Sequence, residues 1–170
     1  SVQRLLLAYR HGIFPWYNED SPILWWSPDP RPIIEPPRLH VPRSLNRLLN
    51  KGRFTVTFDR SFSKVIRACA GVGRPEGEGT WLLDDMIEAY IRLHDLGFAH
   101  SVESWAGGRL VGGIYGVALG RAFFAESMFY IEPNASKVAL VMLARKLEQC
   151  GFHFIDCQQV TAHLMRLGAT

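Results

Sequence analysis

The order of strand and helix patterns after residue 100 constrains the fold more than any other feature. "HSVESWAGGRLVGGIYGVALG" predicts a β-hairpin turning at Gly107-Gly108, because paired glycines accept the positive φ angles of a tight turn. "RAFFAESMF" predicts a third strand, and "NASKVALVMLARKLEQCG" predicts a helix leading to the strand "FHFIDCQ" and the short helix "TAHLMRLG". An antiparallel meander followed by strand–helix–strand predicts one mixed sheet backed by helices, an α+β fold.

The preceding residues predict a small N-terminal unit, residues 1–30, before a larger domain over residues 31–170. "SVQRLLLAYRHG" has the N-cap and terminating glycine of a helix. Residues 13–37 then hold seven prolines and three tryptophans, so we expect a rigid segment without regular structure. The larger domain then shows helix patterns over 43–51, 61–70 and 84–97. It also contains the predicted strand "RFTVTFD" and the glycine-rich loop "GVGRPEGEG".

The composition is typical of a soluble globular protein, with 48% hydrophobic and 21% charged residues among 170. No apolar run approaches the roughly 18–20 residues that span a bilayer, and the start of the chain does not resemble a signal peptide. Three cysteines without metal-ligand spacing indicate reduced thiols. Six histidines form no HExxH motif. We therefore expect a cytoplasmic protein with no membrane partner and no metal.

The positive charges are unevenly distributed. Between Glu35 and Asp59 there is no acid but there are five cations: Arg38, Arg43, Arg47, Lys51 and Arg53. The central three recur every four residues and share one helix face, opposite three leucines. This pattern is found on solvated helix faces, but a one-sided stripe without carboxylates favours binding to phosphates.

A carboxylate at position 126 interrupts a strongly apolar strand, "FFAESMF". Strand alternation allows Glu126 to face solvent. Because burying an unpaired carboxylate is costly, the other interpretation is that Glu126 faces a cleft and meets a cation.

The strand "FHFIDCQQV" ends in a run of polar side chains. On an extended backbone Asp156 and Gln158 share a face, so Asp156 could accept from the amide NH₂ and leave the amide oxygen free for a substrate N–H. In the alternative, Asp156 sits in a strand-end turn and caps the following helix. Cys157 would point into the core.

Seven ordered motifs span nearly the whole chain: "GIFPW", "LWWSPDPR", "EGTW", "GGIYGVALG", "ESMF", "NASK" and "IDCQ". Together they resemble the leucyl/phenylalanyl-tRNA–protein transferases. The resemblance implies a GNAT acetyltransferase-like domain behind a small N-terminal domain, in a protein that extends beyond both Ser1 and Thr170. It implies a cytoplasmic aminoacyltransferase that moves Leu or Phe from Leu-tRNA or Phe-tRNA to proteins with N-terminal Arg or Lys, marking them for degradation.

The resemblance also implies roles for individual residues. Asp156 and Gln158 match the catalytic pair, Glu126 matches an active-site acid, and Trp16 and Trp81 match aromatics around the aminoacyl-adenosine. The apolar pocket for the transferred side chain would be formed by Ile114, Phe123, Leu140, Leu143, Leu147 and Ile155. Strict alternation puts Phe123 and Glu126 on opposite faces, so both can line one site only if the strand bulges. The basic stripe would meet tRNA phosphates.

The implied reaction is aminolysis of an activated ester by a protein α-amine, which requires no ATP, metal or other cofactor. A positioned proton acceptor would suffice, and Asp156 acting through Gln158 is our candidate. Two alternatives remain. An acyl-CoA-dependent N-acyltransferase needs a glycine-rich loop that opens a helix, whereas "RLVGGI" is expected on a strand. A noncatalytic RNA-binding module would leave Glu126 and Asp156 unexplained.

Overall fold

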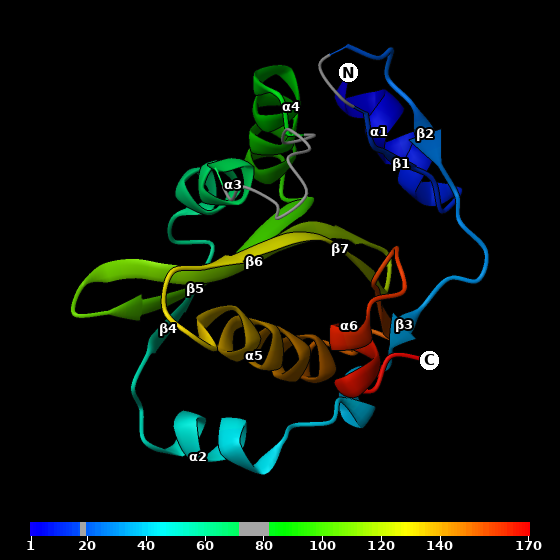
Figure 1. Ribbon diagram of the computed structural model, residues 1–170. Coiled ribbons are helices and arrows are strands. Elements are labelled where there is room, and N and C mark those ends of the chain that lie inside the picture. The colour runs from blue at the N-terminus through cyan, green and yellow to red at the C-terminus, as the bar shows by residue number, and fades with distance from the viewer. Residues whose placement is uncertain (18–19, 72–81) are drawn as a thin grey trace.

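The computed structural model describes residues 1–17, 20–71 and 82–170 (Figure 1). The helices are α1 (Val2–Arg10), the 3-10 turn η1 (Pro36–Arg38), α2 (Arg43–Asn50), α3 (Phe62–Gly71), α4 (Asp84–Asp95), α5 (Ala135–Gln149) and α6 (Ala162–Arg166). The strands are β1 (Phe14–Pro15), β2 (Trp25–Trp26), β3 (Ile33–Ile34), β4 (Thr55–Phe58), β5 (Ala99–Ala106), β6 (Arg109–Leu119), β7 (Ala122–Tyr130) and β8 (Phe154–Asp156).

A six-stranded mixed sheet forms the centre of the molecule, with the strand order β3-β8-β7-β6-β5-β4. Neighbouring strands are antiparallel except β7 and β8, which are parallel and joined through α5. The β5–β6 turn falls at Gly107 and Gly108, with φ angles of 56° and 77°. The predicted meander and strand–helix–strand are confirmed, and the fold is the expected α+β arrangement of one mixed sheet flanked by helices.

Helices cover both faces of this sheet (Figure 1). On one face, α3 and α4 pack against β5, β6 and β7, and α1 packs against α4. On the other face, α5 crosses β5, β6 and β7, with α2 packed on its outer side. Each layer has its own core: Tyr9, Tyr90 and Phe124 belong to the first, and Phe123, Leu140 and Ile155 to the second. Among the described helices, none is long and apolar enough to cross a membrane.

The proline-rich segment after α1 is more ordered than its composition predicts. Phe14 pairs with Trp26 in a two-stranded ribbon, and Ile33 pairs with Asp156 at the edge of the main sheet. The expectation of no regular structure was therefore wrong. Two-residue strands at an edge leave few backbone donors to satisfy, so the neighbouring prolines are tolerated. The division into residues 1–30 and 31–170 stays a prediction.

Two local irregularities shape the region around β7 and β8. Tyr115 of β6 pairs with Ser127 and Gly116 pairs with Ala125, so Glu126 is the extra residue of a β-bulge. The predicted strand "FHFIDCQ" is shorter than expected because β8 stops at Asp156, and Gln158 has φ 62°. The expectation that alternation places Asp156 and Gln158 on one face was wrong, because the backbone is not extended there.

Candidate active site

The parallel pairing of β7 and β8 covers only three positions and ends at Phe124 and Asp156. The bulge follows at once on β7, and a turn follows at once on β8. Glu126 and Gln158 lie in these two irregular segments, and the Gln158 Nε2 atom donates to Glu126 Oε1 at 2.7 Å. The site is therefore built where two neighbouring strands stop pairing.

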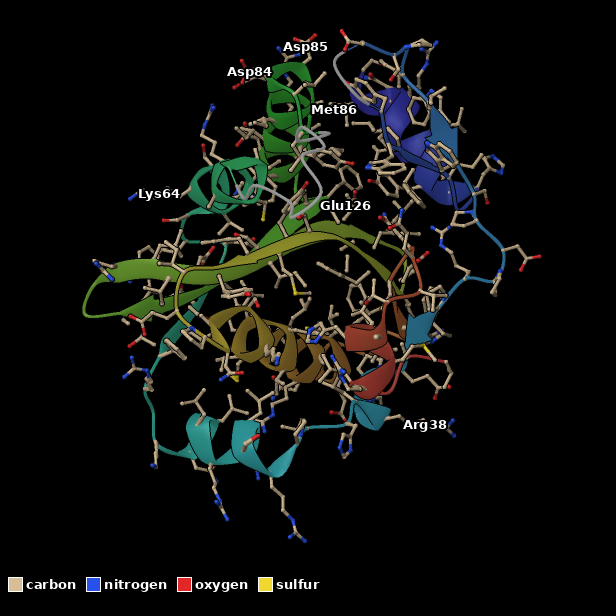
Figure 2. All side chains as sticks on the ribbon, in the orientation of Figure 1. Arg38, Lys64, Asp84, Asp85, Met86 and Glu126 are labelled. Carbon is tan, nitrogen blue, oxygen red and sulfur yellow. The ribbon has the colours of Figure 1, made fainter. Side chains whose placement is uncertain are left out.

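Glu126 accepts hydrogen bonds from two tyrosines as well as from Gln158. The Tyr9 hydroxyl of α1 donates to Oε1 at 2.5 Å, and the Tyr90 hydroxyl of α4 donates to Oε2 at 3.2 Å. The two hydroxyl oxygens lie 2.6 Å apart. Figure 2 shows Glu126 on the side of the sheet that carries α4. The cation expected beside Glu126 is absent among the described residues, where neutral donors occupy its place.

Burial dominates the electrostatics of this carboxyl group. The pKa of Glu126 is raised to about 7: loss of solvation and the nearby Asp156 raise it, and the hydrogen bonds from Tyr9, Gln158 and Tyr90 partly offset this. A carboxyl group with such a pKa exchanges a proton near neutral pH, which suits general acid–base chemistry. The same burial raises the pKa of both tyrosines well above the usual value, so they stay protonated donors.

The arrangement of Asp156 and Gln158 differs from the predicted one. Asp156 Oδ1 accepts from the backbone N–H of Gln158 at 2.8 Å, which closes a strand-end turn. Glu126, not Asp156, holds the amide NH₂ of Gln158. The prediction that Asp156 binds the Gln158 amide was therefore wrong. The amide is nevertheless oriented as predicted, because within the described part of the chain the Gln158 side-chain oxygen accepts no hydrogen bond and is free for a substrate N–H. Thr161, not Asp156, caps α6.

Arg31 is a site residue that the sequence analysis missed. Its Nε donates to Asp156 Oδ1 at 2.8 Å, and its Nη1 donates to the Gly12 carbonyl at 2.7 Å. The guanidinium also lies over the Phe14 ring. Arg31 is the one cation between residues 13 and 37, and an isolated cation in an apolar segment was the available signal. Tyr9 gave no signal beyond its place on the apolar helix face.

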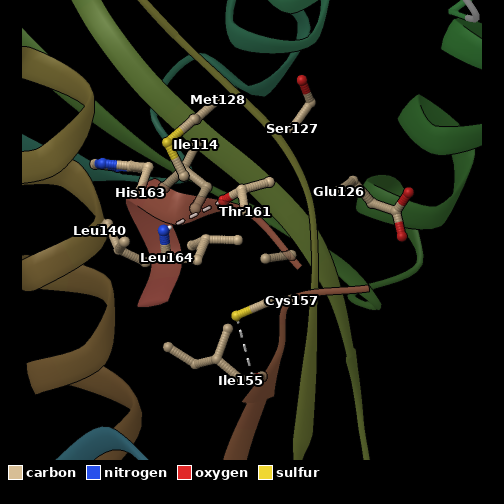
Figure 3. A pocket seen from close by; sticks show the side chains of 11 residues that line it. Ile114, Glu126, Ser127, Met128, Leu140, Ile155, Cys157, Thr161, His163 and Leu164 are labelled. Carbon is tan, nitrogen blue, oxygen red and sulfur yellow. Dashed lines mark hydrogen bonds between the residues drawn. The ribbon is translucent and has the colours of Figure 1, made fainter. Parts of the chain in front are cut away.

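The residues expected to form one apolar pocket are divided between two cavities. Ile114, Leu140 and Ile155 line a cavity of about 220 Å³ beside Glu126 and Cys157. Figure 3 shows its apolar side chains grouped together, with the carboxylate of Glu126 directed away from them. The other three (Phe123, Leu143 and Leu147) line a separate cavity of about 240 Å³. The single pocket that the resemblance implied is thus not present as one space in this structure.

This division follows from the geometry of α5 and β7. Leu143 and Leu147 lie one and two turns beyond Leu140 along α5, so they reach a more distant part of the sheet. Phe123 precedes the bulge and packs in the α5 core, whereas Glu126 faces α1 and α4. The bulge that the sequence required is present, yet it does not bring these two residues into one cavity.

The aromatic candidates are placed as follows. Trp16 is half-buried and makes an edge-to-face contact with Trp26, with ring centroids 5.7 Å apart. The Trp26 indole N–H donates to the Trp16 carbonyl at 2.8 Å. Trp81 lies outside the described residues. Trp16 therefore belongs to a fixed aromatic pair on the ribbon formed by β1 and β2.

The basic stripe forms an exposed surface on and around α2. Arg38 pairs with Glu35, and Arg53 pairs with Glu132 at 2.7 Å. The remaining cations (Arg43, Arg47 and Lys51) make no ion pair with any residue in the described ranges. Leu45 is buried beneath them, as the helix pattern predicted. Helix α2 lies on the α5 side of the sheet, whereas Glu126 faces α4 (Figure 2).

The fold and the site together describe an α+β domain with a carboxyl–amide pair and an apolar cavity where β7 and β8 separate. The sequence model described as "Leucyl/phenylalanyl-tRNA protein transferase" matches residues 33–170, and that of its N-terminal domain matches residues 1–29. The chain belongs to the leucyl/phenylalanyl-tRNA–protein transferase family.

Individual relatives agree with this assignment. The leucyl/phenylalanyl-tRNA–protein transferase of Solidesulfovibrio magneticus is 60% identical over 169 residues, which cover 99% of this chain and 68% of the relative. The transferase of Aromatoleum aromaticum is 61% identical over 165 residues, which cover 97% of this chain and 69% of that relative.

Two solved structures share the fold at low sequence identity. A functionally unknown conserved protein from Staphylococcus epidermidis has a TM-score of 0.53 at 12% identity, covering 82% of this chain and 56% of the other. The L-PGS protein of Bacillus licheniformis has a TM-score of 0.51 at 10% identity, and the match covers 94% of this chain and 51% of L-PGS.

Proposed function

We propose that this chain transfers Leu or Phe from aminoacyl-tRNA to the N-terminal Arg or Lys of an acceptor protein. The new peptide bond would mark the acceptor for degradation, and the reaction would take place in the cytoplasm, where charged tRNA is found. The observation that carries the proposal is the Glu126–Gln158 hydrogen bond beside an apolar cavity. Membership of the transferase family supports the reaction type.

The proposed chemistry uses these groups without a cofactor. The acceptor α-amine attacks the ester carbonyl, a C–N bond forms, and the ester C–O bond breaks to release the tRNA 3′-terminal ribose hydroxyl. The amide oxygen of Gln158 accepts the amine N–H and so directs the nitrogen lone pair to the carbonyl. Glu126, with its pKa near 7, takes up the amine proton as the C–N bond forms and returns it to the leaving ribose oxygen as the C–O bond breaks.

The roles of the remaining site residues follow from their positions. Ile114, Leu140 and Ile155 would enclose the transferred side chain, and each methylene placed there favours Leu or Phe over smaller residues by ~1–3 kcal/mol. Asp156, fixed by Arg31, provides a negative charge for the cationic acceptor. The α2 surface would bind tRNA phosphates.

The alternatives fit the molecule less well. An acyl-CoA-dependent enzyme would need a glycine-rich loop opening a helix, but "RLVGGI" lies within β6. A noncatalytic RNA-binding module would give no role to the buried Glu126 and Asp156, which repel phosphate.

The proposal predicts the behaviour of two variants in a transfer assay with Leu-tRNA and a peptide with N-terminal Arg. Gln158→Ala removes the oriented amide and is expected to lower the rate by roughly 10²-fold, as is Asp156→Ala. The assay measures labelled Leu on the peptide, and acetyl-CoA is run in parallel as a competing donor.

Gln159→Ala is the matched control, because Gln159 is adjacent but exposed. Wild-type transfer by Gln158→Ala and Asp156→Ala, or acetyl transfer in place of leucyl transfer, would contradict the proposed function.

A further inference from the structure

Beside the apolar cavity lies a second one, of about 470 Å³, which opens at the N-terminus of α5. It shares Met128 and His163 with the apolar cavity beside Glu126, so the two spaces adjoin. The proposed function assigns the apolar cavity to the transferred side chain. A group bound in the second cavity would therefore lie close to the nucleotide that carries the amino acid.

Ser136 presents unused hydrogen-bonding groups to this cavity. The residue lines the cavity and is 5% exposed, yet its hydroxyl has no partner among the described residues. The N–H groups of Ser136 and Lys137 belong to the first turn of α5 and have no acceptor within the helix. The N-cap, Asn134, makes no side-chain capping bond. The unpartnered Ser136 hydroxyl thus lies at the cavity beside the positive end of a 15-residue helix.

Among the described residues that line the cavity, Lys137 is the one cation, because the lowered pKa of His163 leaves its imidazole neutral at neutral pH. Lys137 and His163 both line it, and Lys137 forms no ion pair within the described ranges. Burial lowers the pKa of His163, and the positive charges of Lys137 and Arg166 lower it further, which places these three groups close together. Among the described residues that line the cavity, none carries a carboxylate.

The start of α5 is held rigidly against the sheet. Ser104 donates to the Ala135 carbonyl at 2.8 Å. A Cβ atom at Gly112 would lie 2.5 Å from the Ala135 Cβ, so only glycine permits this close approach. The donors are therefore positioned before any ligand arrives, which lowers the entropy lost on binding.

We propose that this cavity binds a phosphate of the tRNA acceptor end, namely the 5′-phosphate of the aminoacylated terminal nucleotide. The Ser136 hydroxyl, the Lys137 ammonium group and the N-terminus of α5 all lie at this cavity, and each of them favours a bound phosphate. The inference rests on the proposed function, because that function places the aminoacyl group in the adjoining cavity.

The test compares a non-hydrolysable 3′-amide analogue of phenylalanyl-adenosine with and without a 5′-phosphate, by titration calorimetry. The wild type is expected to bind the phosphorylated analogue about tenfold more tightly. Ser136→Ala and Lys137→Gln are each expected to bring the ratio of the two affinities closer to one. The affinity for the unphosphorylated analogue should stay unchanged. Lys64→Gln, on α3 across the sheet, is the matched control and should keep the full preference (Figure 2).

Each result has a defined meaning. Equal affinity of the wild type for both analogues, or an unchanged preference in both variants, would overturn the phosphate site alone. Failure of the unphosphorylated analogue to bind would overturn the proposed function and this inference with it. Coenzyme A is the third probe: if Lys137→Gln weakens its binding but not the nucleotide preference, the cavity belongs to a pyrophosphate donor and the assignment to tRNA is wrong.

Discussion

At the scale of single residues, Glu126 links protonation to stability. Its pKa in the folded protein is about 7, whereas an unfolded glutamate titrates near its ordinary value of about 4.3. Between these values the folded protein holds a proton that the unfolded chain has lost. The contribution of Glu126 to stability therefore falls as pH rises from about 5 to 7 and is level above that range.

Replacing this carboxyl group should remove its part of the pH dependence of stability. We expect Glu126→Gln to gain about 2 kcal/mol relative to the wild type between pH 5 and pH 8. Urea denaturation of both proteins at the two pH values measures this difference. Glu88→Gln is the control. Glu88 is an exposed member of a surface ion pair, so replacing it should change the pH dependence of stability little. Parallel pH profiles for the wild type and Glu126→Gln would contradict the assignment.

At the scale of elements, the bulge in β7 depends on the glycine opposite it. A Cβ atom at Gly116 would lie 2.2 Å from the Phe124 carbonyl oxygen and 2.5 Å from the Phe123 ring. We expect Gly116→Ala to destabilise the fold by about 3 kcal/mol and to lower transfer, since Glu126 loses its position. Thermal denaturation and the transfer assay measure both effects. Gly71→Ala, where a Cβ meets nothing within 4 Å, should be nearly neutral.

The elements also show what the sequence could and could not predict. Periodicity and turn residues identified the meander and the helices, because these depend on local pattern. The end of β8 was missed because alternation assumes an extended backbone, and Gln158 departs from one. The hydrogen bond between Tyr9 and Glu126 joins residues 117 positions apart, a separation at which local pattern carries no information. The family resemblance named the acids and the amide but not their partners.

At the scale of the whole molecule, charge and chemistry lie on different faces. The α2 cations are on the α5 side of the sheet, and Glu126 is on the side of α4 (Figure 2). We expect Arg47→Glu to weaken tRNA binding and to lower the slope of log affinity against log salt by about one, because a phosphate contact is lost. Lys64→Glu, which makes the same charge change on α3, should leave both quantities near the wild-type values. If Arg47→Glu left the tRNA affinity and the salt slope unchanged, the basic stripe would be a solvated helix face that does not bind tRNA.

The contact between Tyr9 and Glu126 has a consequence for how the enzyme becomes active during its synthesis. Helix α1 leaves the ribosome well before the partner of its hydroxyl, which follows 117 residues later, and Gln158 comes a further 32 after that. Helix α1 can pack against α4 before that, but the Tyr9 hydroxyl has no carboxyl acceptor until β7 has emerged. Because contacts so distant in sequence form late, a partly made chain holds no assembled proton acceptor. Glu126 therefore acquires its full set of hydrogen-bond donors only after the turn beyond β8 has been synthesised.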